Sequence, residues 1–172
     1  MTSRYRFSFS RISLAALLAA AFVVSRPASA QDLGIDVGAA APVVTVQSLD
    51  GKQVDLGRYI GKTPVLIEFW ATWCSNCREL MPTLLDVEKK YGKQVKFVAL
   101  AVAINQSPEK VRRFLAAHPL PHDTFYDVDG IAAGAFDAPA TSYVVVLDKN
   151  GRVVYTGVGG KQNLEAAIKK AL

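Results

Sequence analysis

Residues 65–77 have the sequence VLIEFWATWCSNC. The first six form a nearly continuous apolar run, which is typical of a buried strand, and the segment after Cys74 has helical periodicity. The chain contains two cysteines, Cys74 and Cys77, and both lie in this stretch with two residues between them. Two thiols at a strand–helix junction predict a dithiol that cycles with a disulfide.

The helix predicted from Ser75 to about Tyr91 assigns different roles to the two cysteines. Cys77 continues the apolar stripe backwards by one turn, so we expect it to be the more buried thiol, whereas Cys74 lies just before the helix and more exposed. Unpaired N–H groups and a partial positive charge at a helix N-terminus stabilise a thiolate. Cys74 is therefore the predicted nucleophile and Cys77 the resolving thiol. A structural staple is a poorer interpretation, because so small a loop gains little stability from a disulfide.

Glu68 is the one charged residue in the apolar strand. A carboxylate in that position lowers stability unless it is solvated, paired or protonated. The functional interpretation is a buried acid with a raised pKa that shuttles the proton of Cys77. The alternative is that Glu68 points to the outer face of the sheet or pairs with Lys62 or Lys96.

The remaining elements follow from periodicity and turn residues. Asp50-Gly51 and Asp148-Lys149-Asn150-Gly151 are hairpin turn signals. Predicted strands cover residues 43–47, 53–56, 65–70, 95–102, about 124–126, 143–147 and 152–156. Predicted helices cover residues 75–91, 107–118, 131–136 and 162–172. This order predicts an α/β fold with a central mixed sheet and helices on both faces.

Residues 1–30 have the layout of a secretory signal peptide. Three arginines precede a short apolar run of about 13 residues, Ile12–Val24, and Ala28-Ser29-Ala30 offers a cleavage site. The run is shorter than the roughly 20 residues that span a bilayer. We therefore expect a cleaved leader, a single domain over residues 31–172, and a periplasmic or secreted protein. The alternative is an uncleaved N-terminal anchor, which would be the only attachment to a membrane.

The net charge of +5 comes from this leader. Residues 1–30 hold four of the 20 basic residues and none of the 15 acidic ones, so the remainder has 16 against 15. The basic composition therefore gives no support for nucleic-acid binding. A domain of 142 residues is large enough for a full core, and we expect it to be a monomer.

Two other chemistries could use the same pair of cysteines. Cys74 and Cys77 together with His118 and His122 nominally meet a zinc ligand count, which would suit a metal-binding or metallochaperone-like module. The 40 residues between Cys77 and His118 depart from the usual short spacing, so no metal is assigned and the histidines are expected at the surface or in loops. The second rival, a thiol peroxidase, predicts rapid consumption of peroxide by the reduced protein.

The segment Phe69-Trp70-Ala71-Thr72-Trp73-Cys74-x-x-Cys77-Arg78-x-x-Met81-Pro82 resembles the active-site segment of thioredoxin-fold proteins. The resemblance is strongest to exported TlpA/ResA-like thiol–disulfide reductases, including the cytochrome c maturation type, and covers nearly all of residues 39–172. It implies a thioredoxin-like fold with an N-terminal β-hairpin extension and reduction of protein disulfides, with no cofactor beyond the Cys74–Cys77 pair. It also implies an upstream membrane thiol as electron donor, and Glu68 matches the family's buried acid.

The chain departs from the family pattern in two places. Ser75-Asn76 stands where the commonest form has Gly-Pro. The family's cis-proline, which orients substrate and keeps metals off the dithiol, aligns with Ser142, while Pro139 lies three residues early. A cis bond before a non-proline residue costs about 2.5–4 kcal/mol, so either the Thr141–Ser142 bond is trans or Pro139 serves in a shifted register. We expect Ser142 at the site, its hydroxyl and N–H contacting a mixed disulfide. The predicted substrate-binding residues are Trp73, Ser75, Asn76, Thr141 and Ser142.

Overall fold

The computed structural model describes residues 1–2 and 33–172. Almost all of the predicted leader, residues 1–30, lies outside the described residues. Within the described part of the chain, no helix is both long and apolar enough to cross a membrane.

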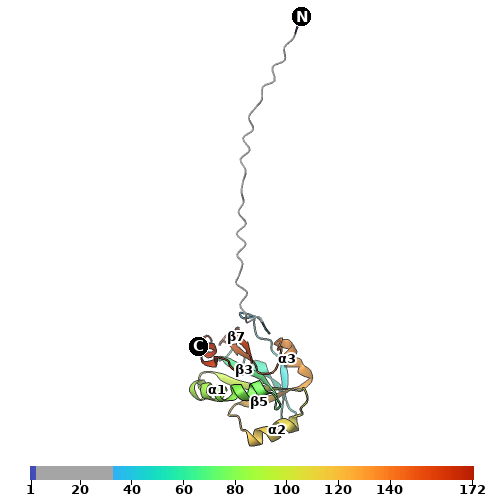
Figure 1. Cartoon of the computed structure of the whole chain (residues 1–172), viewed down its shortest axis with the longest axis vertical. Coiled ribbons are helices and arrows are strands. Elements are labelled where there is room, and N and C mark those ends of the chain that lie inside the picture. Colours follow the sequence, from blue (N-terminus) through green and yellow to red (C-terminus); the bar gives the residue numbers. More distant parts are fainter. Residues whose placement is uncertain (3–32) are drawn as a thin grey trace.

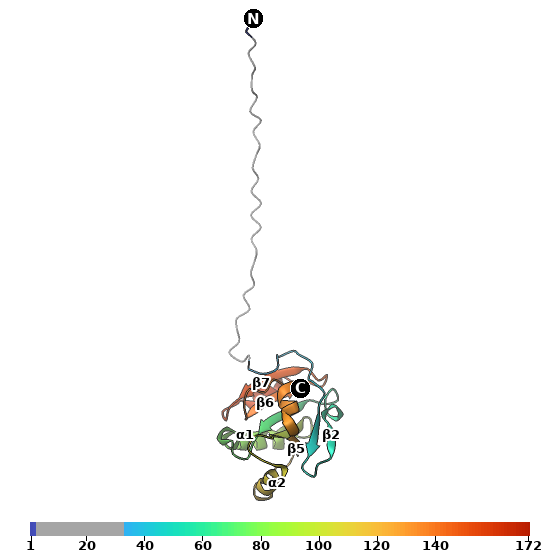
Figure 2. The same cartoon turned by 90° about the vertical axis from the view of Figure 1, so that its right-hand side faces the viewer.

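Seven strands form one mixed sheet in the order β2-β1-β5-β4-β3-β6-β7. β3 pairs in parallel with β4, and β4 with β5, while the pairs β3–β6, β6–β7, β1–β2 and β1–β5 are antiparallel. Figure 2 shows β2 and β7 toward opposite edges of this sheet. The strands are β1 Thr45–Ser48, β2 Gln53–Asp55, β3 Val65–Trp70, β4 Lys96–Val102, β5 Asp123–Asp127, β6 Tyr143–Leu147 and β7 Val153–Val158.

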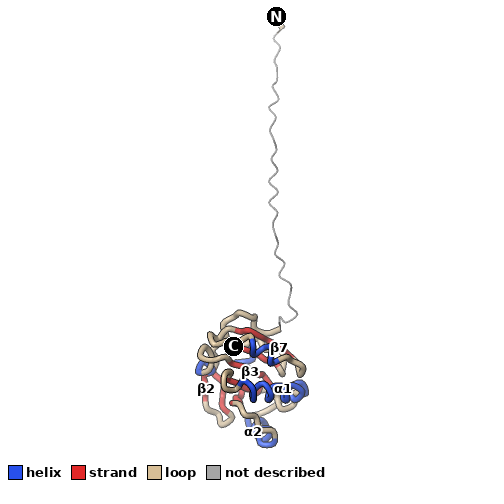
Figure 3. Tube along the Cα trace, turned by 90° about the vertical axis from the view of Figure 1, so that its left-hand side faces the viewer, coloured by secondary structure: helices blue, strands red, loops and turns tan. Residues whose placement is uncertain are grey.

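Helices cover both faces of the sheet, which confirms the predicted fold class (Figure 1). α1 (Ser75–Tyr91) and α4 (Leu164–Lys169) share one apolar cluster with β3, β4 and β6. α2 (Pro108–Ala117) and α3 (Ile131–Ala135) contribute to the cluster on the other face. Figure 3 shows the strands in red with α1 and α2 in blue. Single-turn 3-10 helices at Leu56–Arg58 and Val128–Gly130 complete the elements.

β3 occupies a central position and all six of its residues are buried. It has a partner on each side, so a near-continuous apolar run is the expected sequence for it. Its last residue, Trp70, leads through residues 71–74 directly into α1. The sheet therefore fixes the start of the helix on which the two cysteines lie.

The observed elements follow the predicted ones closely, with differences at the ends. The closing helix spans Leu164–Lys169 and is shorter than predicted at both ends. It begins at Leu164 because the Asn163 side chain caps it by accepting a hydrogen bond from the Ala166 N–H. Ser107 caps α2 in the predicted way, accepting from the Lys110 N–H, with Pro108 at the first helical position.

Leu80→Ala tests the packing of α1 on the sheet. Leu80 is 0% exposed and belongs to the cluster that contains Leu66, Leu84 and Val144. We expect the free energy of unfolding of the oxidised protein, measured by urea denaturation, to fall by about 2–5 kcal/mol because a cavity replaces the side chain. Lys89→Ala, at an exposed position of the same helix, is the control. A loss for Leu80→Ala as small as that of the control would contradict this packing.

Candidate active site

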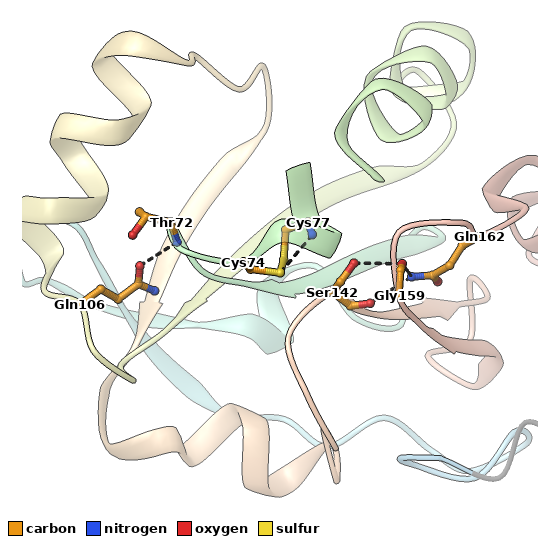
Figure 4. Close-up of a disulfide and its surroundings, with 7 residues drawn as sticks. All are labelled: Thr72, Cys74, Cys77, Gln106, Ser142, Gly159 and Gln162. Carbon is orange, nitrogen blue, oxygen red and sulfur yellow. Dashed lines mark hydrogen bonds between the residues drawn. A yellow bond between two sulfur atoms is a disulfide. The ribbon is translucent and has the colours of Figure 1, made fainter. Parts of the chain in front are cut away.

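Cys74 and Cys77 form a disulfide at the N-terminus of α1. Their Cα atoms lie 5.3 Å apart. Cys74 is the N-cap residue, with extended backbone angles, and its Sγ accepts a hydrogen bond from the Cys77 N–H at 3.0 Å (Figure 4). The sulfur of Cys74 therefore takes the place that a Ser, Thr or Asp oxygen commonly occupies at the start of a helix.

Both cysteines are buried, with Cys74 4% and Cys77 3% exposed. The expectation that Cys74 is exposed while Cys77 is buried is therefore wrong, because Cys74 packs into the same apolar cluster as Cys77. The two thiols differ instead in position: only Cys74 lies at the cap, where the first N–H groups of the helix converge. Ser75 and Asn76, between them, are exposed.

Glu68 is 5% exposed and forms no ion pair with any residue that the structure describes. Lys96, one of its expected partners, pairs with Asp123 instead at 2.8 Å. Glu68 lies two residues after Leu66 on the strand, so it shares the sheet face that α1 covers. Burial raises the pKa of Glu68 to about 8. Its Oε1 atom is buried without a hydrogen-bond partner among the described residues, which favours the protonated acid over the carboxylate.

Two long-range hydrogen bonds hold the loop before Cys74. The Thr72 N–H donates to Gln106 Oε1 at 2.9 Å, and the Trp73 Nε1–H donates to the Ile104 carbonyl at 2.8 Å. Gln106 Nε2 in turn donates to the Val102 carbonyl at 2.6 Å. The segment after β4 is thereby fastened to the active-site loop. Gln106 was not predicted, because it lies between periodic segments and its partner is distant in sequence.

Ser142 lies close to the dithiol in the fold, but its polar groups face inward. No peptide bond in the described part of the chain is cis, and Ser142 has a left-handed backbone with φ of 62°. Its N–H donates to the Phe69 carbonyl at 2.8 Å and its hydroxyl to the Gly159 carbonyl at 3.0 Å. The expected contacts of this hydroxyl and N–H with a mixed disulfide are therefore a wrong prediction, since both donors already have protein acceptors.

An apolar cavity of about 550 Å³ opens beside Trp73. Trp73 is 43% exposed, and Thr141 and Pro139 also line the cavity. Two of the predicted substrate-binding residues, Trp73 and Thr141, thus share one concave surface. The remaining lining residues are Val102, Ala103, Ile104, Asp129, Gly130, Ala133, Ala138 and Ala140.

The two histidines do not join the cysteines. His122 lies in the loop between α2 and β5, as expected. Its side chain is buried, and its Nδ1 lies 2.7 Å from Glu88 Oε2 on α1. His118 stacks on Phe114, with ring centroids 4.6 Å apart. Among residues 1–2 and 33–172, no group of three or more His, Cys, Asp or Glu residues could hold a metal ion. The four-ligand zinc arrangement considered from the sequence is therefore wrong.

Glu68→Gln tests the buried acid through the pH dependence of stability. The pKa of Glu68 is raised from 4.5 to about 8 on folding, so the folded protein binds more protons than the unfolded chain between these values. Stability is then highest below about pH 4.5 and falls as the pH rises through 8, by at most about 1.4 kcal/mol per pH unit.

The glutamine variant should lose this fall, and it should be more stable than the wild-type protein at pH 9 but similar at pH 4. Urea denaturation of the oxidised proteins across this range is the measurement. Parallel pH profiles for the two proteins would contradict a buried, unpaired Glu68.

Comparisons with known proteins agree with this geometry. The Redoxin family matches residues 36–172. The chain is 32% identical over 145 residues to the thioredoxin-like protein YneN of Bacillus subtilis, covering 81% of this chain and 83% of the relative. It is 29% identical to the thiol-disulfide oxidoreductase ResA of Bacillus thuringiensis, covering 79% of each.

A solved structure described as a putative thiol:disulfide interchange protein DsbE, from Chlorobium tepidum, superposes with a TM-score of 0.71 at 27% identity. The superposition covers 80% of this chain and 98% of the other. The predicted resemblance is thereby confirmed. The chain belongs to the Redoxin family, and its thioredoxin-like fold carries the cysteine pair of a thiol–disulfide oxidoreductase.

Proposed function

We propose that this protein is an exported thiol–disulfide oxidoreductase that reduces protein disulfides through Cys74 and Cys77. The observation that carries the proposal is the hydrogen bond from the Cys77 N–H to Cys74 Sγ at the N-terminus of α1. In the reduced protein the same N–H and the positive end of the 17-residue helix stabilise a thiolate on Cys74. Cys74 is then the nucleophile and Cys77 the resolving thiol.

The reaction proceeds by two exchanges. The Cys74 thiolate attacks one sulfur of the substrate disulfide, whose S–S bond breaks, and the departing thiolate takes a proton from solvent. Cys77 then loses its proton and attacks Cys74 Sγ, which breaks the mixed disulfide and releases the second substrate sulfur as a thiolate that takes a proton from solvent. Two electrons pass from the dithiol to the substrate, and the Cys74–Cys77 disulfide remains.

Glu68 receives the proton of Cys77 in the second exchange. Its position on the sheet face beneath α1 and its pKa of about 8 both support this role. An ordinary cysteine thiol has a pKa of about 8.5, so transfer between the two groups is nearly balanced, which suits a general base.

The substrate docks on the surface around Trp73, Ser75, Asn76 and Thr141. Exposure of Trp73 and of the two residues between the cysteines supports this placement. The neighbouring cavity has an almost entirely apolar lining, which suits an apolar side chain of the substrate next to its disulfide. Electron transfer in such transient encounters needs only a small interface.

The cellular setting follows from the predicted leader. Export places the protein in the periplasm or outside the cell, where disulfides persist and cytochrome c maturation is one process that needs reduced thiols. A reductase there requires an electron supply, for which we propose a membrane thiol carrier that reduces the Cys74–Cys77 disulfide. The domain acts as a monomer, with protein thiols and disulfides as its partners.

Cys77→Ser tests the order of the two thiols. Without the resolving thiol, the mixed disulfide on Cys74 cannot be released, so we expect the variant to accumulate covalent complexes with protein substrates. Cys74→Ser is the matched control and should trap far less. Mass spectrometry of the complexes after non-reducing electrophoresis identifies the trapped cysteine and the partners.

The same purified proteins separate the rival functions. The wild-type reduced protein should reduce insulin disulfides with dithiothreitol as electron source, and neither serine variant should do so catalytically. Equal trapping by the two variants would contradict Cys74 as nucleophile. Stoichiometric bound metal without insulin reduction would instead identify a metal-binding module, and fast peroxide consumption without insulin reduction a thiol peroxidase.

A further inference from the structure

Gln162 is a buried polar residue, 9% exposed, in the turn between β7 and α4. Its Nε2 group donates to the Ser142 carbonyl at 3.0 Å and to the Gly159 carbonyl at 2.7 Å. Its Oε1 atom accepts from the Tyr155 hydroxyl at 3.2 Å. The NH₂ group and the oxygen of the amide are therefore both used, and one of the three hydrogen bonds joins segments 20 residues apart.

Ser142 depends on these contacts for its conformation. A left-handed backbone is unfavourable for a residue with a side chain, and the φ of Ser142 is 62°. Its carbonyl accepts from the Gly159 N–H at 3.1 Å as well as from Gln162, and its hydroxyl donates to the Gly159 carbonyl. Ser142, Gly159 and Gln162 thus form a closed hydrogen-bonded unit, which we call the latch.

The absence of a side chain at Gly157 leaves room for the amide of Gln162. Gly157 lies on β7 under the amide of Gln162, and a Cβ atom there would lie 2.6 Å from Gln162 Oε1. A side chain at this position would therefore require the amide of Gln162 and the hydroxyl of Tyr155 to shift. Tyr155, the third partner of Gln162, is half-buried on the same strand.

The latch joins two segments that lie on the same side of the dithiol (Figure 4). On one side, the Ser142 N–H binds the Phe69 carbonyl near the end of β3, just before the loop that carries Cys74. On the other, a Cβ atom on Gly160 would lie 2.6 Å from the Cβ atom of Glu79, two residues after Cys77 on α1. Among the described residues, no hydrogen bond links the latch to the sulfur atom of Cys74 or Cys77.

We propose that Gln162 is a positioning residue that holds the loop of residues 138–142 and the turn at Gly159 in fixed places beside the Cys74–Cys77 pair. The inference rests on the proposed reduction of protein disulfides. The latch fixes the positions of the docking-surface residues that a polypeptide substrate contacts, including Thr141 and Pro139. The geometry of the two thiols does not depend on the latch. A small disulfide that does not contact the docking surface should therefore be reduced at the normal rate.

Gln162→Met is the test, because methionine fills a similar volume and forms none of the three hydrogen bonds. Pre-reduced protein is mixed with increasing insulin or with glutathione disulfide, and single-turnover oxidation is followed by Trp73 and Trp70 fluorescence. We expect the concentration of insulin at half-saturation to rise at least about tenfold, since several hydrogen bonds are lost. The maximal rate with insulin, the rate with glutathione disulfide and the equilibrium constant for thiol–disulfide exchange with glutathione should each change by no more than about twofold.

Three further variants make the result specific. Gln94→Met changes an exposed glutamine whose side chain has no hydrogen bond among the described residues, and it should behave as wild type.

Gln162→Glu should resemble Gln162→Met at pH 8, where a carboxylate cannot donate, and recover partly at acidic pH, where the protonated acid donates again. Ser142→Ala removes only the hydroxyl bond and should raise the half-saturating insulin concentration about threefold; it remains available if Gln162→Met does not fold.

Two results would overturn the role of Gln162. One is an unchanged half-saturating insulin concentration in folded Gln162→Met, or in Ser142→Ala if the methionine variant does not fold. The other is an equal loss of rate with insulin and with glutathione disulfide, which would point to a defect at the sulfur atoms. A wild-type protein that reduces neither compound would instead overturn the proposed function on which the inference rests.

Discussion

The hydrogen bond from the Cys77 N–H to Cys74 Sγ is the contact around which the site is organised. It exists because Cys74 is the N-cap of α1. The position of this cap is set by β3, an interior strand of the sheet, which ends at Trp70 only four residues before Cys74. The first N–H groups of a helix have no acceptor within the helix, so an anion at the cap gains both hydrogen bonds and the favourable helix dipole. The chemistry of the dithiol is thus a consequence of where one strand ends and one helix starts.

The polar side chains around this contact are of two kinds: those that have hydrogen-bond partners and one, Glu68, that has an atom without a partner among the described residues. The polar groups of Gln106 and Ser142 bond to backbone partners, and those of Gln162 bond to two carbonyls and to the Tyr155 hydroxyl. These three residues therefore stiffen the segments that surround the cysteines. Glu68 lacks an ion-pair partner in the described part of the chain, and burial raises its pKa to about 8. Satisfied groups give the site its shape, whereas the unsatisfied acid gives it a proton that can move near neutral pH.

Local patterns in the sequence were enough to predict the sheet, the helices and the redox pair. The apolar run of β3, the helical stripe of α1 and the Asp-Gly and Asn-Gly turns are signals carried by neighbouring residues. The orientation of Ser142 could not be predicted, because its acceptors Phe69 and Gly159 lie far away in sequence. Gln106 and Gln162 were missed for the same reason, since loop glutamines show no periodicity. The burial of Cys74 depends likewise on packing between elements.

The most direct test of the account is a pH titration of the thiolate absorbance of the reduced protein. One thiolate should form well below the ordinary cysteine pKa of about 8.5. It should persist in Cys77→Ser and disappear in Cys74→Ser. The contradicting result is a protein in which no thiolate forms until about pH 8.5, or one in which the low-pKa thiolate survives the loss of Cys74.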